Sequence, residues 1–488
     1  MLFNSFEFAL FFPIVTILFF MLPHKFRWLL LLLASCFFYM FFKPIYILIL
    51  ILTIVIDYYA GIWIGITEDK RKRKRLLLLS IVANVGVLVV FKYYNFLVDN
   101  INVVMSTLHT TGRIPMLNIL LPIGLSFHTF QAMSYTIEVY RGNQKPEKHF
   151  GIYALYVMFY PQLVAGPIER PQNVLHQFHE VKKFNYEQFR SGLILMAWGF
   201  FKKCVIADRL AMFVSDVYGN VNEHHGIPVI IATAFFALQI FCDFSGYSDI
   251  AIGSARCMGY DLMTNFDRPY LATSISEFWR RWHISLSTWF RDYVYIPLGG
   301  NRVSKTRWYL NLLIVFTVSG IWHGANWTFM IWGFLHGMYL VIENVLYEKV
   351  PSIQNATSTV AIFIKRVIVF FLVCLAWVFF RAQTAADAFH IIKSSLVGIP
   401  QQIKDIISNT LNARLHILYV NQTSFNFFVA LMFILIMAII HHSQKKLHFD
   451  QWVLSKKSTT RWAIYYFLVI SFICFGVFNR TDFIYFQF

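Results

Sequence analysis

A succession of apolar runs constrains this chain more than any other feature. The runs lie at about 7–22, 27–42, 44–66, 76–97, 120–140, 192–213, 227–247, 309–325, 328–347, 362–380, 427–443 and 462–479. A helix needs about 20 predominantly apolar residues to cross a bilayer, and a chain in lipid must satisfy its backbone polar groups internally. The runs therefore predict an all-α polytopic membrane protein with about eleven or twelve transmembrane helices.

The composition excludes several other classes of protein. Hydrophobic residues make up 58% of the 488 residues and charged residues 14%, whereas soluble domains have about 25% charged residues. A soluble enzyme, a disordered chain and a disulfide scaffold are therefore excluded. The net charge of +17 comes from basic residues between the apolar runs, which indicates membrane topology rather than nucleic-acid binding. The six cysteines form no CxxC pair, so buried thiols are expected rather than disulfides or zinc ligands.

The distribution of Lys and Arg predicts the orientation of the chain. Residues 70–75 are six consecutive cations after the third run, and basic loops mark the cytoplasmic side. Placing this loop inside puts both termini outside the plasma membrane. Residues 442–461, which carry several cations, then fall inside, and residues 214–226, which carry none, fall outside. The alternative is a patch for lipid headgroups or nucleic acid, but the other loops agree with the topology.

Two stretches do not match the pattern of spans. Residues 151–191 contain a short apolar piece that ends in Gly166-Pro167, and residues 248–308 are basic and rich in tryptophan. Such sequences predict re-entrant and interfacial helices, which protein or a water-filled cavity must shelter. No internal repeat or separable soluble part is visible. We therefore expect a single membrane domain over 1–488, with its functional core at about 120–340.

Polar residues gather between 239 and 336, and His323 is the most conspicuous of them. It lies in an apolar run between Gly320 and Gly324, beside Trp322. An apolar environment disfavours the charged imidazolium, and a neutral imidazole is a competent general base. A histidine that merely packs between helices fits the position equally well, so position alone leaves the two interpretations open.

A second candidate is His283, which lies among Arg280, Arg281 and Arg291. Nearby cations favour the neutral imidazole, although an interfacial histidine of a basic helix is the simpler interpretation of this position taken alone. The arginines could bind the phosphates of a carrier such as a nucleotide thioester, or they could only mark the cytoplasmic side. The chain has no P-loop, no G-x-S-x-G elbow and no H-E-x-x-H motif, and no metal site is expected.

Several motifs make the chain resemble the membrane-bound O-acyltransferase (MBOAT) family, in particular its bacterial alginate O-acetylation branch. The most specific are FWRRWHISLSTWFRDY at 278–293 and GIWHGANW at 320–327. Further similar segments lie at 121–131, 159–171, 243–251, 265–270 and 295–302. The resemblance extends over nearly the whole chain.

The resemblance implies a fold of about eleven transmembrane helices with re-entrant pieces around a central tunnel. It implies that His323 is the invariant family histidine and that His283 is the second one. It also implies an acyl thioester donor such as acetyl-CoA on the cytoplasmic side, no further cofactor, and transfer of acetyl groups outward to a surface polysaccharide or peptidoglycan. An extracytoplasmic acetyltransferase of the SGNH type is the expected partner.

Together these observations predict an O-acyltransferase in which His323 and His283 are catalytic. The residues expected to line the tunnel or bind substrate are Asp243, Tyr247, Arg280, Trp282, Ser287, Trp322 and Asn326. Three alternatives remain: D-alanyl transfer to teichoic acid, transport of the acyl group, and a scaffold for a partner acetyltransferase. A transporter is disfavoured by the lack of symmetry between the halves of the chain.

Overall fold

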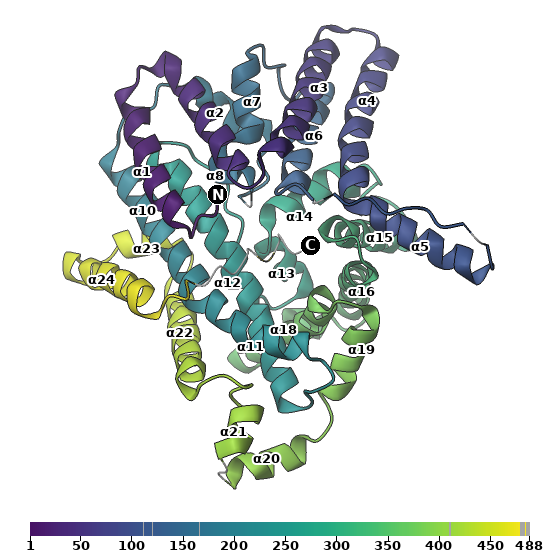
Figure 1. Ribbon diagram of the computed structural model, residues 1–488, viewed down its shortest axis with the longest axis vertical. Helices are drawn as coiled ribbons and strands as arrows, with labels where there is room; N and C mark the ends of the chain where they lie inside the picture. Colours follow the sequence, from purple (N-terminus) through teal and green to yellow (C-terminus); the bar gives the residue numbers. More distant parts are fainter. Residues whose placement is uncertain (111, 120, 165, 409–410, 479–483, 485–488) are drawn as a thin grey trace. The chain divides into compact units, whose positions relative to one another are not determined.

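The computed structural model describes residues 1–488 except 111, 120, 165, 409–410, 479–483 and 485–488. All regular structure in this described part of the chain is helical (Figure 1). The chain divides into two compact units. Unit 1 comprises Met1–Met196 and Tyr247–Thr264, and unit 2 comprises Ala197–Gly246 and Asn265–Phe488. Two helices, α10 (Tyr186–Phe200) and α12 (Ile227–Cys257), contribute residues to both units.

Unit 1 contains the first helices of the chain and several short buried helices. Its elements are α1 (Phe6–Met21), α2 (His24–Met40), η1 (Pro44–Tyr46), α3 (Ile47–Ile66), α4 (Lys70–Leu88), η2 (Val89–Tyr93), α5 (Tyr94–Thr107), α6 (Leu125–Arg141), α7 (Phe150–Met158), α8 (Tyr160–Leu163), α9 (Pro171–Val174), η3 (Leu175–His179) and most of α10 (Tyr186–Phe200). Within this unit, α3 packs against α4 and α6 (Figure 1).

Unit 2 contains the rest of the helices. Its elements are η4 (Phe201–Ala207), α11 (Asp208–Gly219), most of α12 (Ile227–Cys257), η5 (Pro269–Leu271), α13 (Ile275–Arg281), α14 (Ile284–Phe290), η6 (Arg291–Tyr295), α15 (Lys305–His323), α16 (Trp327–Lys349), α17 (Pro351–Asn355), α18 (Thr359–Arg381), α19 (Ala385–Ser394), α20 (Ile399–Ile407), α21 (Leu411–Ile417), α22 (Ser424–Ser443), α23 (Phe449–Leu454) and α24 (Ser458–Phe475). The helices α15 and α16 lie side by side (Figure 1).

Seven helical segments among the described residues are long and apolar enough to cross a membrane. They are Pro44–Ile66, Lys70–Thr107, Ile227–Cys257, Trp327–Lys349, Thr359–Arg381, Ser424–Ser443 and Ser458–Phe475. Their outer faces expose large apolar side chains, such as Phe371 on α18 and Ile473 on α24, which suits contact with lipid. The chain is therefore a multi-pass membrane protein.

The remaining apolar runs form helices that are shorter or more polar than these seven. The run at 7–22 becomes α1, which has 16 residues and a proline at position 13. The run at 192–213 lies in α10, η4 and α11, where it includes Lys203 and Asp208. As the sequence predicts, the stretches 151–191 and 248–308 form several short helices, among them α13 and α14 with seven residues each.

Candidate active site

His283 lies at a sharp bend between two short helices of unit 2. The hydroxyl of Ser274 caps the start of α13 by accepting the backbone N–H of Glu277 at 3.0 Å. Trp282 then leaves the helical conformation, and His283 has a φ of 43°, in the left-handed region. This conformation costs a non-glycine residue on the order of 1–3 kcal/mol, and such strain persists where the surrounding structure enforces it. The fold thus holds the His283 imidazole in one defined direction.

The side-chain oxygen of Asn265 sets the tautomer of His283. Oδ1 of Asn265 lies 3.1 Å from Nδ1 of His283, and it also accepts the backbone N–H of Ser285 at 3.2 Å. A backbone N–H is always a donor, which identifies this atom as the oxygen, so Nδ1 carries the ring proton and Nε2 is the acceptor nitrogen. Burial lowers the pKa of His283 to about 3. The imidazole is therefore neutral at physiological pH and able to accept a proton.

The second histidine is placed by a close crossing of α15 and α16. A Cβ added at Gly320 would lie 2.2 Å from the carbonyl oxygen of Phe329, and one added at Gly333 would lie 2.3 Å from that of Phe316. Two glycines therefore let the backbones of the two helices approach each other directly. This contact holds His323, the last residue of α15, against α16.

Aromatic rings enclose His323. The imidazole is buried, with 3% of the residue exposed. Ring centroids lie 4.8 Å away for Trp322, 4.9 Å for Trp332 and 5.5 Å for Phe380. The His283 ring lies 6.5 Å away. The two histidines therefore share an apolar environment from which aromatic side chains exclude bulk water.

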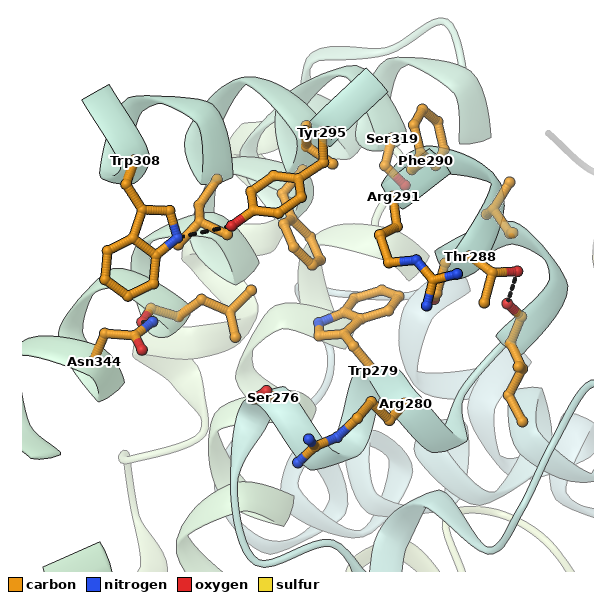
Figure 2. A pocket seen from close by; sticks show the side chains of 17 residues that line it. Ser276, Trp279, Arg280, Thr288, Phe290, Arg291, Tyr295, Trp308, Ser319 and Asn344 are labelled. Carbon is orange, nitrogen blue, oxygen red and sulfur yellow. Dashed lines mark hydrogen bonds between the residues drawn. The ribbon is translucent and has the colours of Figure 1, made fainter. Parts of the chain in front are cut away.

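A cavity of about 570 Å³ lies between α13, α14, η6, α15 and α16. Small-molecule sites typically have about 300–1,000 Å³. Figure 2 shows aromatic rings and two guanidinium groups in the lining of this cavity. The rings belong to Trp279, Phe290 and Trp308, and the guanidinium groups to Arg280 and Arg291. Neither His283 nor His323 is among the residues that line the cavity, but two lining residues are close to them along the chain: Ile284 directly follows His283, and Ser319 precedes His323 by about one helical turn.

Four of the predicted substrate-binding residues lie in this region. Arg280 and Ser287 line the cavity. Trp282 is buried, with its ring 5.1 Å from that of Trp377. Trp322 is also buried and contacts the His323 ring edge-on.

The other three predicted residues make different contacts. Asp243 forms a buried ion pair with Lys203 at 2.8 Å. Asn326 caps the start of α16 by accepting the backbone N–H of Thr328 at 3.1 Å. Tyr247 belongs to unit 1, where its hydroxyl accepts the backbone N–H of Phe3 at 3.4 Å.

Sequence reasoning missed several residues that build this site. Asn265 belongs to the motif at 265–270, but nothing in its local sequence connects it with His283. Trp332 and Phe380 come from α16 and α18, where aromatic residues in apolar helices give no distinct signal. His336 was not missed, since it ends the polar segment 239–336 of the sequence; it accepts a hydrogen bond from the indole N–H of Trp279 at 3.3 Å and thereby joins α13 to α16.

Comparison with known proteins identifies this architecture. The family model of the membrane-bound O-acyltransferases matches residues 148–382, which include both histidines and the whole cavity. Together with the relatives described next, this match shows that the chain belongs to the membrane-bound O-acyltransferase family. The protein is therefore an O-acyltransferase.

The relatives include enzymes of bacterial cell envelopes. The chain is 41% identical over 395 residues to the probable alginate O-acetylase AlgI of Pseudomonas aeruginosa, with 80% of this chain and 74% of the relative covered. It is 36% identical over 395 residues to the peptidoglycan O-acetyltransferase of Helicobacter pylori, a match that covers 76% of this chain and 73% of the relative. It is 29% identical over 250 residues to the teichoic acid D-alanyltransferase of Streptococcus thermophilus, a match that covers 48% of this chain and 59% of the relative.

Proposed function

We propose that this protein moves acetyl groups from a cytoplasmic thioester across the plasma membrane to hydroxyl groups of an extracytoplasmic polysaccharide, either an alginate-like exopolysaccharide or peptidoglycan. The observation that carries the proposal is the pair of buried histidines beside a cavity with arginines in its lining. The names of the acetylating relatives, which match about three quarters of the chain or more, support acetyl as the transferred group.

In this mechanism His323 acts as the general base. It takes the proton from the acceptor hydroxyl while the oxygen attacks the carbonyl carbon of the thioester. The C–S bond then breaks, and His323 passes the proton to the departing sulfur, which leaves as the thiol. The aromatic rings around His323 favour this role because they exclude water that would otherwise hydrolyse the thioester.

His283 orients the donor or the acceptor in the same site. Its Nδ1–H is held by Asn265, so Nε2 is positioned to accept a hydrogen bond from a hydroxyl or a thiol. Its neutral state also matters, because an imidazolium at this place would oppose proton transfer to His323.

The cavity between α13 and α16 binds the carrier part of the donor. Arg280 and Arg291 are both exposed and line the cavity, so they can contact phosphates while an acyl arm enters between the aromatic rings. Both arginines belong to the basic segment that we assign to the cytoplasmic side, with both chain termini outside. An SGNH-type acetyltransferase or the polysaccharide itself then receives the acetyl group on the other side.

D-alanyl transfer to teichoic acid is the second candidate, because a D-alanyltransferase matches 48% of this chain. The acetylating relatives match with higher identity over a larger share, which favours acetyl. Two further alternatives, an acyl-group transporter and a scaffold, require no catalytic histidine.

The test compares surface polysaccharides from a strain that lacks this protein with those from the strain restored with the native chain. Mild base releases ester-bound groups, and acetate and D-alanine are measured separately. Acetate that disappears in the deletion strain and returns on restoration supports acetyl transfer. D-alanine that disappears and returns in the same way supports the second candidate. If neither acetate nor D-alanine changes, both acetyl transfer and D-alanyl transfer are contradicted.

A further inference from the structure

We propose that Asp57 in the middle of α3 is a proton-binding site, and that it holds a proton in the folded protein. Asp57 is completely buried within a candidate membrane span. A charged carboxylate inside a bilayer is unfavourable unless it is paired or neutralised. This site belongs to unit 1 and contains none of the residues assigned to acyl transfer.

Among the described residues, no Lys, Arg or His forms an ion pair with Asp57. Two basic side chains of α4 and η2 make contacts elsewhere: Arg73 donates to the carbonyl oxygen of Tyr140 at 2.8 Å, and Lys92 contacts the hydroxyl of Ser126 at 3.4 Å. The groups that do reach Asp57 from α4 are the neutral side chains of Ser80 and Asn84.

The hydrogen-bond chain that starts at Asp57 contains more contacts than its hydroxyl groups can supply. Oδ1 of Asp57 lies 2.6 Å from the Ser80 hydroxyl. That hydroxyl lies 3.0 Å from the hydroxyl of Thr136 on α6, and the Thr136 hydroxyl lies 3.2 Å from the carbonyl oxygen of Met133. Three oxygen–oxygen contacts need three hydrogens, but Ser80 and Thr136 have one hydroxyl hydrogen each.

A proton on Asp57 completes this chain. Asp57 then donates to Ser80, Ser80 donates to Thr136, and Thr136 donates to Met133. The side-chain amide of Asn84 does not supply the missing hydrogen. Its nitrogen lies 2.9 and 2.8 Å from the two carboxyl oxygens of Asp57 and 3.0 Å from the carbonyl oxygen of Ser80, so its two N–H groups are already used. An ionised Asp57 would leave one of the three contacts as an oxygen pair with no hydrogen between the atoms.

The other titratable groups that face Asp57 do not provide a counter-charge. Tyr135 on α6 and Tyr153 on α7 lie close enough to interact with it electrostatically. Both are buried, and their ring centroids lie 4.4 Å apart. Their hydroxyls are neutral when protonated, so they add no positive charge. The proton on Asp57 thus lets α3, α4 and α6 pack together inside the membrane without a buried charge.

The experiment uses the full-length protein in detergent and the variant Asp57→Asn. Asparagine has nearly the same shape as a protonated aspartic acid and can donate to Ser80, so we expect the variant to fold. The infrared spectrum of the native protein at pH 7 should contain a protonated-carboxyl band that the Asp57→Asn variant lacks. The control Asp99→Asn removes an exposed carboxylate of the same unit and should leave that band unchanged.

Stability provides an independent readout, because a proton bound only in the folded state makes folding pH-dependent. The folded-to-unfolded ratio of the native protein should fall about tenfold per pH unit between about pH 5 and 7, relative to Asp57→Asn. The melting temperature of the native protein should therefore fall over this range relative to that of the variant.

Two results would overturn the proposal. One is an infrared difference spectrum, native protein minus Asp57→Asn, that contains no carboxyl band, together with melting temperatures that depend on pH in the same way in both proteins. This result would mean that Asp57 is ionised. The other is stabilisation of the native protein but not of the variant when sodium replaces potassium, which would indicate a cation site. If Asp57→Asn does not accumulate, Thr136→Val carries the test: it should shift the carboxyl band, and an unchanged spectrum would contradict the proposal. None of these readouts depends on acyl transfer.

Discussion

The imidazole rings of His283 and His323 lie 6.5 Å apart between their centroids and are inclined at 59°. They come from different segments, one at the bend before α14 and the other at the end of α15. The two rings are therefore close neighbours, and we propose that both contact one small reacting group.

Asn265→Asp should make acyl transfer sensitive to acid. In the native protein the pKa of His283 is about 3 because of burial, so the ring is neutral throughout pH 5–9 and adds no pH dependence. An aspartate beside Nδ1 favours the imidazolium and raises the pKa of His283. Activity of the variant should then fall as the pH is lowered through the raised pKa, whereas native activity should not respond to His283.

The pH profile of kcat/KM checks this prediction. Ser285→Ala is the matched control, because it removes another hydrogen bond to Asn265 at 2.9 Å without adding a charge. The control should keep the native profile. An Asn265→Asp profile that superimposes on the native one would contradict the proposed contact between Asn265 and His283.

Gly320→Ala should destabilise the protein and reduce activity. The new Cβ would lie 2.2 Å from the carbonyl oxygen of Phe329, so α15 and α16 must separate and His323 must move. Overpacking of this kind costs about 1–3 kcal/mol of unfolding free energy. Thermal unfolding in detergent measures the loss.

Gly86→Ala on α4 is the control for this substitution. An added Cβ meets nothing within 4 Å there, and alanine stabilises a helix relative to glycine by about 0.5–1 kcal/mol. The control should therefore be neutral or slightly stabilising. If both variants behave alike, the close crossing of α15 and α16 does not hold the site.

Arg280→Ala and Arg291→Ala should raise KM for the thioester donor more than they lower kcat. Hydrogen bonds to charged groups contribute about 1.5–3 kcal/mol, so loss of a phosphate contact should raise KM about tenfold or more. Arg302→Ala makes the same charge change in the exposed segment after η6, outside the cavity lining, and should leave KM nearly unchanged. Equal effects of all three substitutions would indicate general electrostatics rather than a donor site.

The helical membrane fold could be predicted from the sequence, and the two histidines could be singled out as candidates, because both leave local signals. Apolar runs identify α3, α18 and α22 directly, and His323 stands out between two glycines in an apolar run. The partners of Asp243 and Tyr247 could not be predicted, since an ion pair with Lys203 and a contact with Phe3 depend on how distant segments pack. Asn265 was missed for the same reason: its role comes from the bend at His283, which no residue pattern specifies.

The most direct test of the central claim is the amount of base-labile acetate on surface polysaccharides from strains that produce the native protein, His323→Ala or His390→Ala at equal membrane abundance. His390 is an exposed histidine of α19 and provides the matched control. Loss of a general base typically reduces a rate about 10²–10⁴-fold. We predict that acetate falls to the level of the deletion strain in His323→Ala and stays at the native level in His390→Ala. Full acetylation in the His323→Ala strain would contradict the catalytic assignment and favour a transporter or a scaffold.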